Sequence, residues 1–246
     1  MKEWITGRNP VYEVFQAKRR DIFRLFVAEG IQEKGRLMQI TDLARQRKIP
    51  IEQVPRARID HMGENPQGVA LEVSGYPYCD LTDILDLAEK RQELPFILIL
   101  DTLQNPQNLG TLLRTSEVVG VHGVILPFRH TADVTPAVVS ASAGASEHML
   151  ITQGNLAQLI ERLKEENIWI IGLEGSPEAQ LPEDTRMDGP LALVVGNEGE
   201  GMRPLVRKSC DMLLRLPMVG KIESLNAAVA GSVALYLAFQ ARHQSN

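Results

Sequence analysis

The residues best suited to chemistry lie in the segment 193–202, which reads LVVGNEGEGM. An apolar run ends there in Gly196, Gly199 and Gly201, with Glu198 and Glu200 between them. Glycine is used where the backbone needs a positive φ or where another molecule approaches the main chain closely. The spacing matches neither the dinucleotide motif G-x-G-x-x-G nor a P-loop, and carboxylates would repel a phosphate. A neutral or cationic ligand fits this loop better, and an ordinary tight turn is the alternative.

Two further polar segments follow apolar, strand-like runs. Residues 105–114 read NPQNLGTLLR after the run 96–100, and residues 216–230 contain LPM and SLNAAVA after the run 212–216. Three motifs therefore occur at three predicted strand exits. Their order is N-x-x-N-x-G-x-x-x-R, then G-N-E-G-x-G, then L-P-M followed by S-L-N-A-A-V-A.

With these motifs the sequence resembles the SpoU/TrmH family of RNA ribose 2′-O-methyltransferases, within the SPOUT superfamily, over about residues 95–240. The preceding segment, which ends in NPQGVA at residues 65–70, is similar to the RNA-binding domain of ribosomal-RNA members, above all those that methylate a guanosine ribose in large-subunit (23S) ribosomal RNA. The resemblance implies S-adenosylmethionine as cofactor, ribosomal RNA as partner and a homodimer. It also implies a deep trefoil knot in the last third of the chain, with the glycine loop beside the loop 216–226.

Site residues follow from the same resemblance. We expect Gly196, Leu216 and Leu225 to contact the cofactor, with Met218 nearby. Core packing at a strand end and a helix start is the alternative for the two leucines. The resemblance also implies a set of catalytic residues, which are Arg114, Asn108, Glu198, Ser224 and Asn226.

The implied reaction is attack of a ribose 2′-hydroxyl on the sulfonium methyl group. A neutral hydroxyl is a poor nucleophile, so the site must position it, help to remove its proton or stabilise the developing alkoxide. The guanidinium of Arg114 is always charged, which makes it a poor general base. We expect it to hold the target phosphate and to stabilise the oxyanion with its fork of donors.

The other polar candidates keep two interpretations each. Asn108 and Asn226 could hydrogen-bond the nucleotide or tie the motifs together, and Glu198 could orient Arg114 or accept a proton. Ser224 could be a catalytic hydroxyl or a cap near the start of the last helix. Asn105 is better suited to fixing its loop. The five histidines fall outside the motifs and are assigned no chemistry.

Charge is unevenly distributed along the 246 residues. Residues 1–75 carry 13 Lys and Arg against 10 Asp and Glu, a net charge of +3, whereas residues 76–246 carry 13 against 21, a net charge of −8. The first part is therefore the better candidate for RNA contact, and solvated helix faces are the alternative. Its basic residues are clustered in 18–20, Arg24, 45–48, Arg56 and Arg58.

Composition excludes several classes of protein. Cys79 and Cys210 provide neither a disulfide framework nor a metal-ligand cluster, so we expect no metal. The N-terminal residues lack an apolar stretch suited to a signal peptide, and the apolar run 227–239 is too short to span a bilayer. We therefore expect a cytoplasmic protein that does not enter a membrane.

Hydrophobic patterning predicts an α/β protein with two domains. Residues 1–75 are predicted to form a small αβ sandwich, of the kind found in a ribosomal protein, that binds the RNA substrate, and residues 76–94 a linker containing a helix at 81–91. Residues 95–246 are predicted to form the methyltransferase domain, because fully apolar strands alternate with helices as in a parallel sheet covered on both faces. The expected strands are 96–100, 123–126, 168–173, 191–195 and 212–216, and the expected helices are 109–119, 156–166 and 226–243.

Two other functions remain open on the sequence. A transfer-RNA ribose methyltransferase would share the three motifs, although such members commonly lack the N-terminal sandwich. A ribosome-assembly protein that binds RNA without catalysis is the alternative from another class. The presence of Arg114, Glu198, Ser224 and Asn226 argues against an idle domain.

Overall fold

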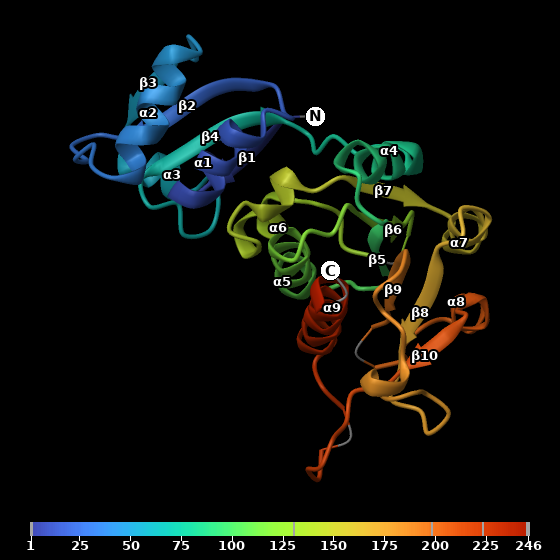
Figure 1. Ribbon diagram of the computed structural model, residues 1–246. Helices are drawn as coiled ribbons and strands as arrows, with labels where there is room; N and C mark the ends of the chain where they lie inside the picture. The colour runs from blue at the N-terminus through green and yellow to red at the C-terminus, as the bar shows by residue number, and fades with distance from the viewer. Residues whose placement is uncertain (1, 130, 198, 223, 245–246) are drawn as a thin grey trace. The chain divides into compact units, whose positions relative to one another are not determined.

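The computed structural model describes residues 2–129, 131–197, 199–222 and 224–244, and it is shown in Figure 1. Packing divides the chain into two compact units. The first comprises Met1–Pro77 together with Asp133–His148, and the second comprises Tyr78–Ala132 together with Met149–Asn246.

The first unit is built on a mixed sheet with the strand order β1-β4-β2-β3. Strand β4 is antiparallel to both β1 and β2, and β2 is parallel to β3. Helices α1 and α2 pack together, and α3 contributes Ile59 to a cluster that contains Phe26 from β2. The elements are β1 (Lys2–Thr6), α1 (Arg8–Ala17), β2 (Ile22–Ala28), α2 (Arg36–Gln46), β3 (Ile51–Val54), α3 (Arg56–Asp60) and β4 (Val69–Ser74).

A segment from the middle of the chain completes this unit. Residues 133–148 contain α6 (Pro136–Ala141) and the 3₁₀ helix η1 (Ala145–His148). Arg20 donates from Nε and Nη2 to the two oxygens of Glu147, each at 2.9 Å, and from Nη1 to Glu3 at 2.7 Å. The side chain of Arg20 is fully buried. This bidentate pair therefore joins two parts of the unit that are far apart in sequence.

The structure changes the expectation that the basic clusters of residues 1–75 face RNA. Arg20 cannot do so because it is buried, and Arg19 donates to Tyr76 Oη and to the Pro77 carbonyl, both at 3.0 Å. Arg24 and Arg58 both pair with Glu52, at 2.7 and 2.8 Å. Sequence clustering indicated a phosphate-binding surface, but four of these nine cations, Arg20, Arg24, Arg45 and Arg58, are paired with carboxylates within the unit.

The second unit is a parallel α/β sheet, as predicted. Among the described residues six strands follow the order β10-β8-β9-β5-β6-β7, and every neighbouring pair is parallel. The strands are β5 (Phe96–Leu100), β6 (Gly123–Pro127), β7 (Ile151–Gly154), β8 (Trp169–Leu173), β9 (Leu191–Val195) and β10 (Met212–Leu214). The helices are α4 (Leu81–Arg91), α5 (Pro106–Val118), α7 (Leu156–Glu165), the 3₁₀ helix η2 (Pro182–Asp184), α8 (Pro204–Ser209) and α9 (Ala227–Gln244).

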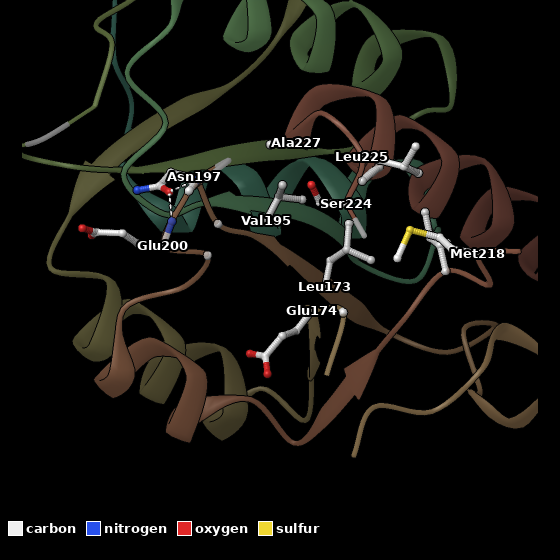
Figure 2. Close-up of a pocket in the computed structure, with 15 residues that line it drawn as sticks. Leu173, Glu174, Val195, Asn197, Glu200, Met218, Ser224, Leu225 and Ala227 are labelled. Carbon is white, nitrogen blue, oxygen red and sulfur yellow. Dashed lines mark hydrogen bonds between the residues drawn. The ribbon is translucent and has the colours of Figure 1, made fainter. Parts of the chain in front are cut away.

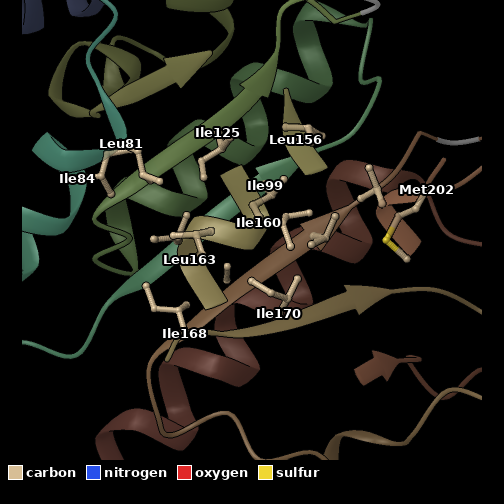
Figure 3. Close-up of a cluster of buried hydrophobic side chains, with 14 residues drawn as sticks. Leu81, Ile84, Ile99, Ile125, Leu156, Ile160, Leu163, Ile168, Ile170 and Met202 are labelled. Atoms are coloured by element: carbon tan, nitrogen blue, oxygen red, sulfur yellow. The ribbon is translucent and has the colours of Figure 1, made fainter. Parts of the chain in front are cut away.

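Alternate strand residues face two helical layers. On one face the buried side chains of Ile97, Ile99 and Val194 pack with those of α4, α7 and α8. Figure 3 shows Ile99 in this cluster with Ile84 of α4 and Ile160 of α7. On the other face α9 packs against α5 and β9. A Cβ added to Gly231 would lie 2.7 Å from Leu112, so the glycine allows α9 to approach α5 closely.

Helix α4 belongs to this core. Leu81 and Ile84 are buried in the same cluster, so the segment predicted as a linker at residues 76–94 includes a helix packed on the sheet. Strands β1 and β7 and the short helices α3, α6 and α8 were missed, because their few residues carry little periodicity. Strand β10 ends at Leu214, two residues earlier than predicted, and the chain then continues toward the predicted cofactor residues.

Candidate functional site

A cavity of about 320 Å³ lies where β8 and β9 end. Its volume is at the lower end of the range for small-molecule sites, about 300–1,000 Å³. Figure 2 shows it between the glycine loop and the segment that leads into α9. All four predicted cofactor residues, Gly196, Leu216, Met218 and Leu225, line it together with Ser224. The other lining residues are Leu173, Glu174, Gly175, Val195, Asn197, Gly199, Glu200, Gly201, Ala227 and Ala230.

The glycine loop is folded tightly on itself. The Asn197 amide donates to the Gly201 carbonyl at 3.1 Å, and Asn197 Oδ1 accepts from the amides of Gly199 and Glu200 at 2.9 and 2.7 Å. A Cβ on Gly196 would lie 2.2 Å from the carbonyl carbon of Gly201, and Gly201 has φ of +69°. The close approach therefore requires glycine at position 196, and the positive φ favours glycine at position 201. Glu198, a predicted catalytic residue, lies outside the described residues.

A buried carboxylate fixes the far end of the loop. Asp101 follows β5, is 0 % exposed, and accepts from the Arg203 amide at 2.8 Å and from Arg203 Nε at 2.7 Å. Next to it, Thr102 Oγ1 accepts from Asn197 Nδ2 at 3.3 Å. The exit of β5 thus holds both ends of the glycine loop, a role that sequence reasoning missed because Asp101 stands outside the motifs.

The first and third motifs meet through their asparagines. Asn226 Nδ2 donates to Asn108 Oδ1 at 3.3 Å, and Asn226 Oδ1 accepts from the amides of Ala228 and Val229 at the start of α9. Asn105 caps α5 by accepting from the Gln107 amide at 2.8 Å, and Pro106 follows it. The expectation that Asn105 fixes its loop is confirmed, and one of the two interpretations of Asn108 and Asn226, a tie between motifs, is seen directly.

Arg114 lies outside the cavity. It is exposed on α5, and within the described part of the chain no carboxylate lies within ion-pair distance of it. Ser224 is also exposed at the cavity, and Asn226 provides the cap that had been an alternative role for this serine. The structure therefore gathers the predicted cofactor residues in one hollow and leaves the arginine on a neighbouring surface.

Three apolar residues of the cavity, Leu216, Met218 and Leu225, are not buried in the core. Met218 is 43 % exposed and Leu225 is 45 % exposed, whereas Leu216 is partly buried. Core packing, the alternative for the two leucines, is therefore wrong for Leu225. Exposed large apolar side chains beside a loop of glycines provide a surface that a planar, partly apolar ligand could cover.

Carboxylates give the cavity its charge. Arg207 Nε donates to both oxygens of Glu174, at 3.0 and 2.8 Å, and this hydrogen bonding holds the pKa of Glu174 below its ordinary value. Glu174 is thus ionised at neutral pH, and Glu200 lines the same space. A neutral or cationic ligand fits this charge. Glu174 was missed from the sequence, although Glu174-Gly175 after an apolar run has the same form as the other strand exits.

Comparison with known families agrees with this geometry. Residues 95–236 match the SpoU rRNA Methylase family, and residues 4–79 match the domain described as RNA 2′-O ribose methyltransferase substrate binding. The chain belongs to the SpoU/TrmH family of RNA methyltransferases. A Bacillus subtilis protein, provisionally named a TrmH family tRNA/rRNA methyltransferase, is 42% identical over 98% of this chain and 96% of its own length.

Solved structures share the fold over different lengths. An AdoMet-bound rRNA methyltransferase from Sinorhizobium meliloti is 22% identical, with a TM-score of 0.77, and the alignment covers 97% of this chain and 87% of that one. The TrmH/SpoU tRNA modifying enzyme of A. aeolicus is 26% identical, with a TM-score of 0.57, and the alignment covers 67% of this chain and 83% of that one.

Within the ranges that the structure describes, His, Cys, Asp and Glu form no group of three or more that could hold a metal ion. In the same residues no helix combines the length and the apolar character needed to cross a membrane.

Proposed function

We propose that this enzyme transfers a methyl group from S-adenosylmethionine to the 2′-hydroxyl of a guanosine ribose in large-subunit (23S) ribosomal RNA. The observation that carries the proposal is the convergence of motifs. Glycines of the loop line one cavity at an edge of a parallel sheet, together with Leu216, Met218, Ser224 and Leu225. Asn226, the residue after Leu225, is hydrogen-bonded to Asn108 of the first motif. Open α/β sheets bind ligands at the carboxyl ends of their strands.

The cavity suits S-adenosylmethionine by its shape and charge. Backbone groups around Gly196 and Gly201 can hydrogen-bond an adenine edge and ribose hydroxyls, and Leu225 and Met218 can cover the apolar surface of the base. The ionised Glu174 and Glu200 can attract the ammonium and sulfonium groups. We propose a trefoil knot in the last third of the chain, which the position of the glycine loop beside residues 216–225 supports.

Protein side chains must then prepare the hydroxyl for attack. In the reaction the 2′-oxygen forms a bond to the methyl carbon, the carbon–sulfur bond breaks, and the hydroxyl proton leaves. We assign Arg114 to the target phosphate and to the developing oxyanion, because its fork of donors has no competing partner among the described residues. Ser224 is a candidate for orienting the hydroxyl, Asn108 and Asn226 hold the motifs together, and Glu198 is a candidate for accepting the proton.

A homodimer would complete this arrangement. On α9 the side chains of Val229, Val233 and Tyr236 are 49, 42 and 47 % exposed and lie along one face, and Val118 on α5 is 60 % exposed. Arg114 is exposed on the same helix as Val118. Pairing through α5 and α9 would bury this apolar surface and place a second chain beside Arg114.

Ribosomal RNA is favoured over transfer RNA by the extent of the alignments. The rRNA methyltransferase neighbour aligns over 97% of this chain, whereas the tRNA modifying enzyme aligns over 67%. A match to a substrate-binding domain at residues 4–79 agrees with a dedicated unit for a folded RNA. Transfer RNA is the second candidate, and a non-catalytic assembly role is disfavoured by the retained Arg114, Ser224 and Asn226.

A cytoplasmic location stays a prediction.

The first unit is proposed to select the RNA, with contacts that differ from those expected. A hollow lined by Arg8, Arg56 and one carboxylate, Glu29, keeps two arginines near solvent. Arg56 is 77 % exposed in its side chain and lies 4.0 Å from Asp60, so it is weakly paired. Of the basic residues expected from the sequence, Arg56 therefore stays a proposed phosphate contact, Arg8 is added, and Arg19 and Arg20 are withdrawn.

Two measurements test the function. Purified protein is incubated with labelled S-adenosylmethionine and with either ribosomal or transfer RNA, and 2′-O-methyl groups are mapped in RNA from cells that lack the gene. We expect labelling of large-subunit RNA and the loss of one 2′-O-methylguanosine. Labelling of transfer RNA alone would select the second candidate. Cofactor binding without methylation of either RNA would contradict catalysis.

A further inference from the structure

A second hollow lies at the same edge of the sheet, where β6 and β7 end. Pro127 and Gly154 are paired in register at these ends, and both line the hollow. Phe128 and Leu205 also line it, and they are 70 and 63 % exposed. Large apolar side chains are thus presented to solvent beside a cavity that contains no part of the proposed cofactor site.

The charge of this hollow is opposite to that of the cofactor cavity. Within the described residues the charged side chains that line it are Arg129 and Arg203, whereas Glu174 and Glu200 line the cofactor cavity. This contrast occurs in a part of the chain, residues 76–246, whose net charge is −8. A hollow with two arginines and an exposed phenylalanine fits an anionic ligand that carries an aromatic ring.

Arg203 is held in place before any ligand arrives. Its Nε donates to the buried carboxylate of Asp101 at 2.7 Å, and its side chain is 44 % exposed. Within the described residues its two terminal amino groups donate to no protein acceptor. A guanidinium fixed at Nε can still present both amino groups to a phosphate, with little loss of conformational entropy on binding.

We propose that this hollow binds a nucleotide of the substrate RNA next to the methylated one, with its phosphate on Arg129 and Arg203 and its base stacked on Phe128. The inference rests on the proposed function. The strand order β9-β5-β6-β7 places the ends of these strands in a row, with Asp101 of the β5 exit between the two hollows. Strands lie about 4.8 Å apart, so the two hollows, at the ends of β8 and β9 and of β6 and β7, are separated by three spacings or roughly 14 Å, which a short single-stranded segment can span. Stacking on an aromatic ring combined with arginine contacts is the common mode for single-stranded RNA.

Substitutions at the exposed residues test this subsite in the full-length protein. Phe128→Ala and Arg129→Glu are compared with Trp169→Ala and Arg186→Glu, a matched pair that lines a separate hollow at the opposite, amino-terminal edge of the sheet. Arg203→Lys keeps the charge and removes the fork, whereas alanine there would leave Asp101 unpaired. For each variant KM and kcat for ribosomal RNA are measured over a range of salt, and S-adenosylmethionine affinity is measured by calorimetry.

We expect KM for RNA to rise about fivefold or more for Phe128→Ala and about tenfold for Arg129→Glu, with the salt dependence of RNA binding reduced for the second. The affinity of Phe128→Ala and Arg129→Glu for S-adenosylmethionine should stay unchanged, and so should the KM of the two control variants for RNA. An unchanged KM in Phe128→Ala and Arg129→Glu, with an active wild type, overturns the subsite and leaves the function standing. Weaker cofactor binding in these variants also overturns it, because the hollow would then serve the cofactor. If the wild-type protein methylates no RNA, the proposed function fails and this inference fails with it.

Discussion

Arginines serve different purposes in the two units. In the first unit the sequence carries excess positive charge, but several arginines are engaged by carboxylates. Arg20 is buried between Glu3 and Glu147. Arg24 and Arg58 share Glu52, and Arg45 pairs with Glu33 and Asp42. In the acidic second unit Arg114 and Arg129 are exposed on or beside the carboxyl edge of the sheet.

The comparison shows that the number of cations in a segment is a poor measure of its ability to bind phosphate. An arginine whose terminal amino groups are paired with a carboxylate must break that pair before those groups can contact RNA, whereas Arg203, which is paired through Nε, keeps them available. A buried arginine must also leave a desolvated partner behind, which is costly. The pairing state of each side chain, rather than local net charge, therefore decides where phosphate can bind. The predictions below test this difference.

The largest effect is expected at Arg20. Arg20→Ala should lower the free energy of unfolding by about 3–5 kcal/mol, because it leaves Glu147 buried without its partner. Denaturant titration measures this loss. The control is Arg24→Ala, which removes an exposed ion pair of the same unit and should change the free energy of unfolding only slightly. A stable Arg20→Ala protein with weakened RNA binding would show that Arg20 is free to contact RNA and would break the comparison.

Arg114 should show the opposite behaviour, with activity lost and stability kept. Arg114→Ala should lower kcat by about 10²–10³-fold, the usual cost of removing an oxyanion donor, while the affinity for S-adenosylmethionine stays the same. Single-turnover methyl transfer and calorimetry measure the two quantities. Arg162→Ala, an exposed arginine on α7, is the control. Full activity of Arg114→Ala would remove its catalytic assignment.

The glycine loop provides a test that does not involve charge. Gly196→Ala should weaken cofactor binding by at least about tenfold, since the new Cβ would lie 2.2 Å from Gly201 and the loop would have to open. Gly175→Ala is the matched control, because this glycine lines the same cavity and its Cβ would meet nothing within 4 Å. Equal affinities of the two variants would contradict the role of the loop.

A smaller effect is expected for the weakly paired arginine of the first unit. Arg56→Gln should weaken RNA binding severalfold and reduce its salt slope by about 1, as the loss of one phosphate contact does. Arg24→Gln should leave both quantities unchanged, because Arg24 is engaged by Glu52. Substitution is preferable to removal of residues 1–75, since the segment Asp133–His148 packs with them and would lose its partners. If Arg24→Gln weakens RNA binding as much as Arg56→Gln does, pairing with a carboxylate does not decide whether an arginine can contact phosphate.

The smallest effect concerns pH. Arg207 lowers the pKa of Glu174 in the folded protein relative to the ordinary value of 4.5, so the pair stabilises the fold at pH values above 4.5 and this contribution is lost as the pH falls through the lower folded value. Glu174→Gln should therefore lower Tm by no more than about 2 °C at pH 7, and by less as the pH falls below 4.5. Thermal melts of the wild type and the variant from pH 3 to 7 measure this. A difference in Tm that grows toward low pH would contradict a stabilising pair between Arg207 and ionised Glu174.

The sequence by itself determined the elements with strong local patterns. Apolar runs such as 96–100 and 191–195 became β5 and β9, because a strand buried on both faces is apolar throughout. The motifs contain Gly196, Leu216, Met218, Leu225 and Ser224, which line one cavity in the structure. The family resemblance supplied the expectation that the two loops lie side by side.

Only the tertiary structure decided which polar residues are paired. The contacts of Arg20 with Glu147, of Asp101 with Arg203 and of Glu174 with Arg207 join residues that are 127, 102 and 33 positions apart. Burial and pairing of this kind depend on which elements pack together, and the local composition of a segment does not determine that packing. For the same reason charge counting indicated an RNA-binding surface around Arg19 and Arg20, whereas folding encloses Arg20 and leaves Arg129 and Arg203 beside an open hollow.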